Sequence, residues 1–286
     1  MDTGPLAQLL IERFDAMPSQ LQVAARFVLD HPAEVALISM REQAHQAGVS
    51  HTTMMRLARW LDLDSYEDMR SLYAKALREP GSWPVEPRNS SESRNSDGAR
   101  PTVELVTGSL ATHMARLGEQ GNATQFFDAA EILTTSRNVF SLGTRAEYPV
   151  AHHLVYVSSL IGRHITMLDA IGGTGIDALR NAGQGDAVVA VSLAPYSRAT
   201  FEIAELASQR GMKIVAITDS KVSPLARLAQ TVIVVATNSE PLFRSVSSAF
   251  AAAEVLVALI AERSETNVEE TVRSSEALLT GLGVYL

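Results

Sequence analysis

Residues 39–61 read SMREQAHQAGVSHTTMMRLARWL, and their pattern predicts two short helices joined by a tight turn. Ala44 is small enough to let the two helices cross closely, and Gly48 can adopt the positive φ that ends the first helix. Ser50 can cap the second helix, because its hydroxyl can accept a hydrogen bond from a backbone N–H of the first turn. The stretch therefore has the pattern of a helix-turn-helix.

The second helix of this motif has one apolar side. Met54, Leu57, Ala58 and Leu61 recur at spacings of three and four residues, so they share a face that packs inward. The opposite side, near the helix start, is where a recognition helix meets base edges and phosphates. The DNA-binding residues that we predict here are Ser50, His51, Thr52, Thr53, Arg56 and Arg59. The alternative is a helical domain that binds a protein partner.

Composition and charge limit the class of protein. The chain has 286 residues, 46% hydrophobic and 20% charged, which is enough for two folded domains. Cysteine is absent, which excludes disulfides, thiolate catalysis and cysteine zinc sites. The net charge of −8 does not favour nucleic acid, although the local balance within residues 39–61 is positive. The N-terminus lacks the apolar run of a signal peptide, so we expect a cytoplasmic protein.

Three segments follow from the change in composition along the chain. Helical patterns fill residues 1–78, which we predict to be an all-helical DNA-binding domain; Ser65 and Asp68 are spaced like a capping box at its last helix. Residues 79–101 are rich in Pro, Ser, Asn and charged groups, which predicts a flexible linker. The third segment is residues 102–286.

Short β-branched runs alternate with helical patterns in residues 102–286. The runs are continuous and apolar, as expected for strands buried on both faces, and they include NVFSLG, DAVVAVSL, KIVAITD and TVIVVA. Because helices separate these runs, the sequence predicts a parallel sheet flanked by helices on both faces. A short helix is also expected at residues 224–228.

Residues 183–229 resemble a sugar isomerase (SIS) domain. The resemblance is carried by Gly185-Asp186, a serine-containing loop over 192–197, Thr218-Asp219-Ser220 and Ser223-Pro224-Leu225-Ala226. A helix-turn-helix, a linker and a SIS domain in this order resemble the RpiR/MurR-like bacterial transcription regulators. The resemblance implies a homodimer or homotetramer that binds double-stranded operator DNA and responds to a small-molecule effector, often a phosphosugar.

The loops that would hold this effector depart from the family pattern. Arg145 stands where a second hydroxyl residue is usual, and the second loop keeps only Ser192 and Ser197 of its hydroxyls. Loops that follow parallel strands present helix N-termini to anions, and arginine grips carboxylate or phosphate with two hydrogen bonds. We therefore predict an anionic or hydroxylated metabolite bound by Thr144, Arg145, Ser192, Ser197 and Arg198, with Ser239, Glu240, Arg244 and Ser245 contributed by a neighbouring subunit. The alternative is that the arginines are surface or interface groups.

No catalytic residue, metal or cofactor is expected. His152 and His153 are adjacent on a predicted helix and point about 100° apart, so they do not form a metal site. The main hypothesis is a DNA-binding regulator that senses a metabolite. The alternative is an aldose–ketose phosphate isomerase, for which Glu147, Glu202 and His152 are the candidate acid–base residues.

Overall fold

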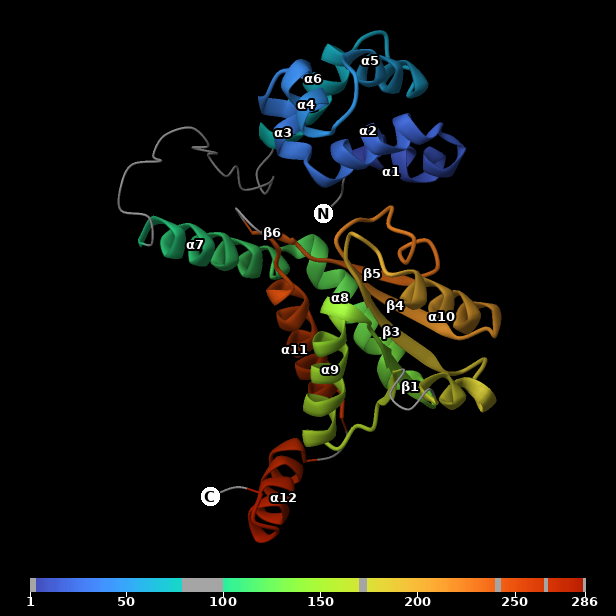
Figure 1. Ribbon diagram of the computed structural model, residues 1–286, viewed down its shortest axis with the longest axis vertical. Helices are drawn as coiled ribbons and strands as arrows, with labels where there is room; N and C mark the ends of the chain where they lie inside the picture. Colours follow the sequence, from blue (N-terminus) through green and yellow to red (C-terminus); the bar gives the residue numbers. More distant parts are fainter. Residues whose placement is uncertain (1–3, 79–99, 170–173, 240–242, 265–266, 285–286) are drawn as a thin grey trace. The chain divides into compact units, whose positions relative to one another are not determined.

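A computed structural model describes residues 4–78, 100–169, 174–239, 243–264 and 267–284 (Figure 1). The chain divides into two compact units, one built from the N-terminal helices and the other from a sheet with its surrounding helices. Each unit is described by itself. The predicted linker lies almost wholly outside the described residues, and its last two residues, Arg100 and Pro101, belong to a helix.

The N-terminal unit is all-helical, as predicted. Its elements are α1 (Gly4–Arg13), the 3₁₀ turn η1 (Phe14–Ala16), α2 (Ser19–Asp30), α3 (Pro32–Leu37), α4 (Met40–Gln46), α5 (His51–Trp60) and α6 (Tyr66–Arg78). The inward stripe of α2 consists of Leu21, Ala24, Ala25 and Val28, joined by Phe27. Proline at the first position of α3 ends α2, because its ring cannot continue the preceding helix.

A buried amide ties α3, α4 and α6 together. The side chain of Gln43 is fully buried, and its Nε2 donates to the carbonyl oxygens of Val35 and Ile38, each at 3.0 Å. The hydroxyl of Tyr66 donates to Oε1 of the same amide. Every polar atom of Gln43 therefore has a partner, which a buried amide requires for stability.

The second unit is built on a five-stranded parallel sheet, which confirms the predicted fold class. The strands are β1 (Val139–Leu142), β2 (Thr166–Leu168), β3 (Ala187–Ser192), β4 (Lys213–Thr218) and β5 (Thr231–Val234), in the spatial order β2-β1-β3-β4-β5. The register pairs the first and last residues of β3 with those of β4, so Ser192 lies beside Thr218. β1 and β3 are entirely buried, which explains why they contain almost no polar residues.

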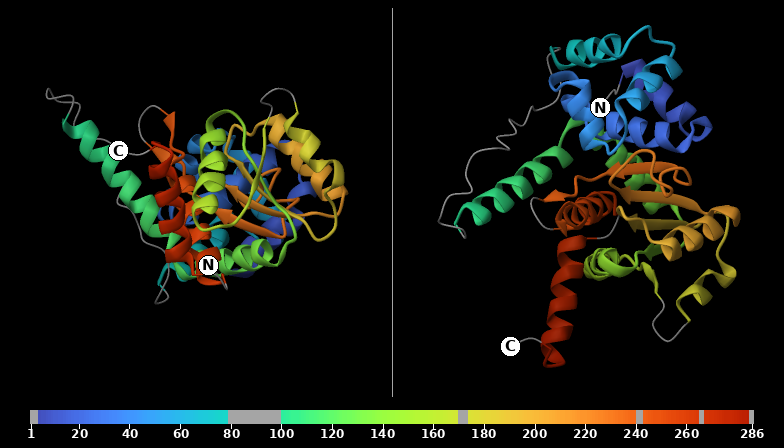
Figure 2. Two further views of the ribbon diagram at one scale, coloured as in Figure 1. Left: turned by 90° about the horizontal axis from the view of Figure 1, so that it is seen from below. Right: turned by 45° about the horizontal axis from the view of Figure 1, so that its top comes forward.

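Helices cover both faces of this sheet (Figures 1 and 2). One face packs on α8 (Gln120–Thr135), α9 (Tyr148–Leu160) and α11 (Ser247–Glu262), with Leu133, Leu154 and Leu256 in its core. The other face packs on α10 (Arg198–Gln209) and the 3₁₀ segment η4 (Gly175–Asn181), with Leu179 and Ala204 in its core. The helices α7 (Arg100–Leu117) and α12 (Val268–Gly281) complete the unit, and α12 contains no buried residue.

Two local features differ from the expectation. Residues 224–228 form turns and not a helix, held by the Ser223 hydroxyl, which accepts from the backbone N–H of Ala226 at 3.0 Å. A short antiparallel pair, β6 (Asn238–Ser239) and β7 (Phe243–Arg244), precedes α11 and was not predicted, because two-residue strands have no periodicity to read. Within the described ranges, no helix has both the length and the apolar character needed to cross a lipid bilayer.

The amino-terminal edge of the sheet holds a saturated polar network. Asp186 is fully buried, and its carboxylate accepts from Arg137 Nη2 at 2.8 Å, the Gly183 backbone N–H at 2.9 Å and Asn138 Nδ2 at 2.9 Å. Burial acts to raise the pKa of Asp186, but these hydrogen bonds outweigh it and hold the pKa below its ordinary value. The network fixes the turn that leads into β3.

Candidate nucleic-acid interface and candidate ligand site

The turn between α4 and α5 has the geometry that the sequence predicts. Gly48 adopts φ +67°, and the backbone N–H of Val49 donates to the carbonyl of Ala44 at 3.0 Å. This 6→1 hydrogen bond is the mark of a helix that ends on a left-handed glycine. Ser39 and Ser50 cap α4 and α5, and each hydroxyl accepts from the backbone N–H three residues ahead. Both helices therefore have a capped N-terminus.

The faces of α5 agree with the sequence except at one residue. Met54, Leu57, Ala58 and Leu61 are buried, as predicted. Ser50 and most of the outward candidates are exposed: His51, Thr52, Arg56 and Arg59.

Thr53, predicted to face outward, is buried. Its hydroxyl lies 2.9 Å from that of Ser50, because a side chain at the third helical position turns back onto the cap. The prediction that Thr53 meets DNA is therefore wrong. Met55, which the sequence reasoning passed over, is exposed on the outward side instead.

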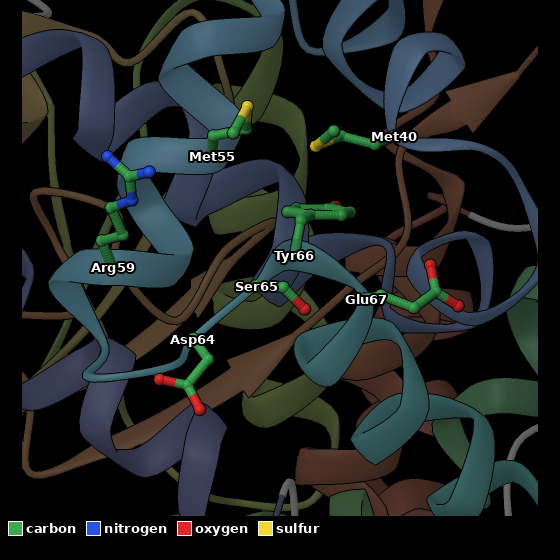
Figure 3. A pocket seen from close by; sticks show the side chains of 7 residues that line it. All are labelled: Met40, Met55, Arg59, Asp64, Ser65, Tyr66 and Glu67. Carbon is green, nitrogen blue, oxygen red and sulfur yellow. The ribbon is translucent and has the colours of Figure 1, made fainter.

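Arg56 and Arg59 have different surroundings. Arg59 lines a hollow of about 260 Å³ together with Met40, Met55, Asp64, Ser65, Tyr66 and Glu67 (Figure 3). Two carboxylates, those of Asp64 and Glu67, thus border the same hollow as Arg59 and reduce the positive potential there. Arg56 does not line this hollow, and it is the stronger candidate for a DNA contact from α5.

The topological switch point of the sheet lies between β1 and β3, and the term β1–β3 crevice is used below for the region outside the carboxyl ends of these two strands. These two strands are neighbours, but the helices that follow them, α9 and α10, lie on opposite faces of the sheet. In open α/β sheets, ligands bind outside the carboxyl ends of the strands at the point where the helices diverge in this way. Thr144 is the second residue after β1, and Ser192 is the last residue of β3. The structure thus brings the predicted ligand residues of the two loops to one edge.

Three hydroxyls join the two sides of the crevice. Thr144 Oγ1 donates to Ser197 Oγ at 2.7 Å and lies 2.8 Å from Thr200 Oγ1. Ser197 also caps α10, where its Oγ lies 3.5 Å from the backbone nitrogen of Thr200. Thr200 was missed by the sequence reasoning, although it is fully buried at the first turn of α10. The hydroxyl cluster fixes the N-terminus of α10, whose first amides lack intrahelical partners, beside the loop after β1.

The predicted arginines stand around this cluster. Arg145 is exposed and adopts φ +56°, a left-handed conformation that residues other than glycine rarely adopt. Arg198 is exposed, and its Nη1 lies 3.9 Å from Oε1 of Glu202. Strained backbone at the start of a candidate site is typical of binding loops.

Arg244, which we predicted to reach the site of a neighbouring subunit, makes an ion pair within its own chain. Its Nη1 lies 3.3 Å from Oδ2 of Asp219 in the same chain, at the carboxyl end of β4. Ser239 belongs to β6, and Ser245 is buried before α11. Glu240 lies outside the described residues. The β6–β7 pair therefore delivers Arg244 to its own crevice, a contact that a two-residue strand pair hides from sequence reasoning.

A buried carboxyl also belongs to this edge. Glu147 is only 9% exposed, and burial raises the pKa of its carboxyl despite hydrogen bonds from its own backbone N–H and that of Leu193. Nearby Asp219 raises this pKa further, whereas Arg145 lowers it. The sequence reasoning weighed Glu147 only as an acid–base residue. The other two such candidates, Glu202 and His152, are exposed on the helix surfaces of α10 and α9.

Gly143 is what allows Glu147 to lie here. A Cβ at this position would stand 2.7 Å from the carbonyl oxygen of Glu147 and 2.9 Å from Cβ of Ala151. Both distances are shorter than van der Waals contact, so only glycine lets the start of α9 approach the end of β1. Thr144, Arg145 and Glu147 are all placed by this close approach.

The architecture defines a class: a helix-turn-helix unit combined with a doubly wound α/β unit whose switch point lies between β1 and β3. Residues 132–261 match the SIS domain family and form a SIS domain. With both features, the chain resembles the RpiR/MurR-like transcription regulators.

Three known proteins illustrate this likeness. An HTH-type transcriptional regulator of Caldanaerobacter subterraneus is 23% identical, with 92% of each chain aligned. The sugar isomerase domain of an RpiR transcription factor from Sphaerobacter thermophilus is 27% identical, with a TM-score of 0.55 over 60% of this chain and 96% of that one. The NanR protein of Vibrio vulnificus, in complex with ManNAc-6P, shares the fold with a TM-score of 0.56 and 23% identity over 96% of this chain and 98% of that one.

The chain also matches the bifunctional Glk proteins of Burkholderia species such as Burkholderia thailandensis. The identity is 28% over 79% of this chain, which spans only 35% of the length of the Glk protein. The likeness to Glk therefore concerns a part of a longer protein.

Proposed function

We propose that the chain is a DNA-binding transcription regulator whose SIS domain senses a small anionic or sugar-like metabolite. The observation that carries this proposal is the presence, in one chain, of an exposed capped helix after a left-handed glycine turn and of a switch-point crevice lined by hydroxyls. Residues 1–78 serve as the DNA-reading domain, and residues 102–286 bind the effector and form the oligomer. Two reading helices in a homodimer or homotetramer occupy successive half-sites in the major groove.

The effector acts by changing the arrangement of the two DNA-reading helices. Such a switch requires that the ligand binds one arrangement more tightly than the other. The change that the ligand causes in the free energy of DNA binding equals the change that DNA causes in the free energy of ligand binding. NanR, which shares the fold, is known in complex with a phosphosugar, ManNAc-6P, and this supports an effector with an anionic group. The crevice at the carboxyl end of β1 and β3 is the proposed place for it.

The test is retention of fragmented genomic DNA by the purified full chain, followed by sequencing. The wild type should retain a few fragments that share an inverted repeat. Arg56→Ala should weaken binding to such a fragment by about 1–3 kcal/mol, because it removes a guanidinium from the outward face of α5. Lys213→Ala removes an exposed positive charge from the sheet unit and is the matched control, with unchanged retention expected. Equal loss in both variants, or no retention by the wild type, contradicts the proposal.

An aldose–ketose phosphate isomerase is the second candidate, favoured by the position of buried Glu147 at the crevice. A carboxyl there is close to where the carbons of a bound sugar would lie, and such a group can transfer protons between them. Conversion of a phosphosugar by the wild type, abolished in Glu147→Gln, would establish the enzyme. Retention of DNA without turnover would exclude it.

A further inference from the structure

The outward face of α5 carries an apolar side chain among polar ones. Thr52, Arg56 and Arg59 share this face, because they follow one another at spacings of four and three residues. Met55 lies on the same face, three residues after Thr52 and four before Arg59, and it is 39% exposed. Single exposed apolar side chains are common on protein surfaces and need no explanation by themselves. Met55 differs from them because it borders a hollow.

One part of this hollow is apolar. Met40, the first residue of α4, and Met55 both line it, and their side chains point toward one another (Figure 3). Tyr66 also lines it, and its hydroxyl already donates to the buried amide of Gln43, so the ring is what remains for further contact. Two thioethers and an aromatic ring thus form an apolar surface beside the outward face of α5. Methionine is flexible and polarisable, so such a surface can adapt to a small apolar group.

The polar groups around the hollow disfavour a phosphate there. The hydroxyl of Ser65 is engaged in the capping box, where it donates to Oδ2 of Asp68 at 2.8 Å and accepts from the backbone N–H of Asp68 at 3.2 Å. Asp64 and Glu67 border the hollow with carboxylates, which repel the phosphates of a nucleic acid. Arg59 is the one positive group among the residues that line it. A phosphate would therefore meet more negative than positive charge, whereas a neutral apolar group would not be repelled.

The major groove of DNA offers such a neutral apolar group. Thymine carries a 5-methyl group there, next to its O4 acceptor, and none of the other three standard DNA bases has one. Met55 is the fifth residue of α5, one turn after Thr52, near the end of a recognition helix that contacts base edges. Arg56, on the same face, suits a polyanion such as a duplex better than the apolar surface of a protein partner. A thymine base thus fits both the charge of the face and the apolar part of the hollow.

We propose that Met40 and Met55, with the ring of Tyr66, form a subsite for the 5-methyl group of one thymine in each half-site. This inference rests on the proposed function, because it names a base that the DNA-reading helix selects. Arg56 contributes positive charge on the same face, whereas the methionines determine the preference for one T·A base pair. The subsite discriminates thymine from cytosine and from uracil, since both of these bases lack the methyl group.

The experiment removes the methyl group and leaves the rest of the DNA unchanged. In the inverted-repeat duplex that the wild type retains, each thymine of one half-site is replaced in turn by uracil, and the affinity of the full chain is measured by fluorescence anisotropy. At one position the wild type should lose affinity by about threefold to fivefold, which is what the burial of one methyl group contributes.

Met55→Ala should bind the thymine and uracil duplexes with equal affinity, because it removes the thioether that contacts the methyl group. Met40→Ala should reduce the difference between the two duplexes, since it removes the facing wall of the hollow. Leu72→Ala is the matched control, because Leu72 is an exposed apolar residue on α6 that does not line the hollow. It should keep the full difference.

Two results would overturn the thymine subsite while the regulator proposal stands. One is that the wild type binds its duplex but no uracil replacement lowers the affinity, which is also the result expected if the hollow holds an apolar side chain of a protein partner. The other is that the loss caused by uracil persists in Met55→Ala, checked for native circular dichroism. If the wild type retains no duplex at all, the regulator proposal fails, and the subsite fails with it.

Discussion

The two edges of the parallel sheet treat a buried carboxyl in opposite ways. At the amino edge, Asp186 is paired with Arg137, Asn138 and Gly183, and its pKa lies below the ordinary value. At the carboxyl edge, Glu147 is crowded by Asp219, and burial raises its pKa. One edge has its polar groups arranged for stability, and the other keeps an arrangement that is costly to the fold. The difference supports the proposal that a ligand binds at the carboxyl edge.

The largest effect on stability is expected at Asp186, on the amino edge. Asp186→Ala should lower the free energy of unfolding of the sheet unit by about 2–3 kcal/mol, because it removes a buried carboxylate that accepts hydrogen bonds from Arg137, Asn138 and Gly183. The lowered pKa means that the contribution of Asp186 is present above the pKa of an unfolded aspartate and is lost as the pH falls through the folded value. Urea unfolding of wild type and variant at neutral and acidic pH measures both effects. Equal stability at neutral pH would show that the network is not what holds this edge.

Gly143→Ala tests the packing that shapes the carboxyl edge. The new Cβ would collide with backbone of Glu147, so we expect a loss of about 2 kcal/mol in unfolding free energy and loss of ligand binding at the crevice. Gly108→Ala, inside α7 where nothing lies within 4 Å, is the control and should stabilise the chain by up to about 1 kcal/mol. Both are measured by chemical denaturation. If Gly143→Ala behaves like the control, the close approach of α9 is not required.

Arg145 and Arg198 allow a test of backbone strain within the carboxyl edge, because only Arg145 of the two has a left-handed backbone. Arg145→Gly should raise the unfolding free energy by about 1 kcal/mol, because glycine adopts the left-handed conformation without strain. Arg198→Gly, at the first position of α10, should lower it by up to about 1 kcal/mol, since glycine is a poor helix former. Thermal unfolding of the two variants measures these changes. A loss of stability in Arg145→Gly would mean that the arginine side chain itself stabilises the fold.

The smallest expected effect is at Glu147. A raised pKa means that the folded state is favoured below the pKa of an unfolded glutamate and loses that advantage as the pH rises through the folded value. Glu147→Gln removes this loss and should raise the unfolding free energy at neutral pH by about 0.5–1 kcal/mol. This is the usual size of the gain when a destabilising residue of a functional site is replaced. The slope of stability against pH should have the opposite sign to that of Asp186. If Glu147→Gln has a lower unfolding free energy than the wild type at neutral pH, the buried Glu147 carboxyl does not destabilise the fold.

Local signals explain what could be predicted from the sequence. The cap at Ser50 and the apolar stripe from Met54 depend on residues a few positions apart, and the structure confirms them. The same holds for the capping box, in which Ser65 and Asp68 exchange hydrogen bonds. Thr53 was misplaced because its face is decided by the cap, which overrides the helical period.

Tertiary structure explains what could not be predicted. Thr200 contacts Thr144 across 56 positions in the sequence. Asp219 follows β4 and Glu147 follows β1, so the charge of Asp219 acts on Glu147 only in the folded sheet. No pattern of residue spacing in the sequence predicts such long-range interactions. The departures of the ligand loops from the family pattern, at Arg145 and after Ser192, lie at the carboxyl edge of the sheet, where we propose that the ligand binds. They could not reveal the carboxyls of Glu147 and Asp219 at the same edge.

The central claim is that the crevice between β1 and β3 controls DNA binding. The most direct test is the affinity for one retained genomic duplex, measured by fluorescence anisotropy with and without a phosphosugar probe, ManNAc-6P, for wild type and Arg145→Asn. Asparagine tolerates the left-handed backbone and replaces the long cationic side chain with a short neutral one. We predict that the probe changes the affinity of the wild type at least about fivefold, whereas Arg145→Asn binds the duplex equally with and without it. An unchanged wild type, or the same change in both proteins, would contradict the account.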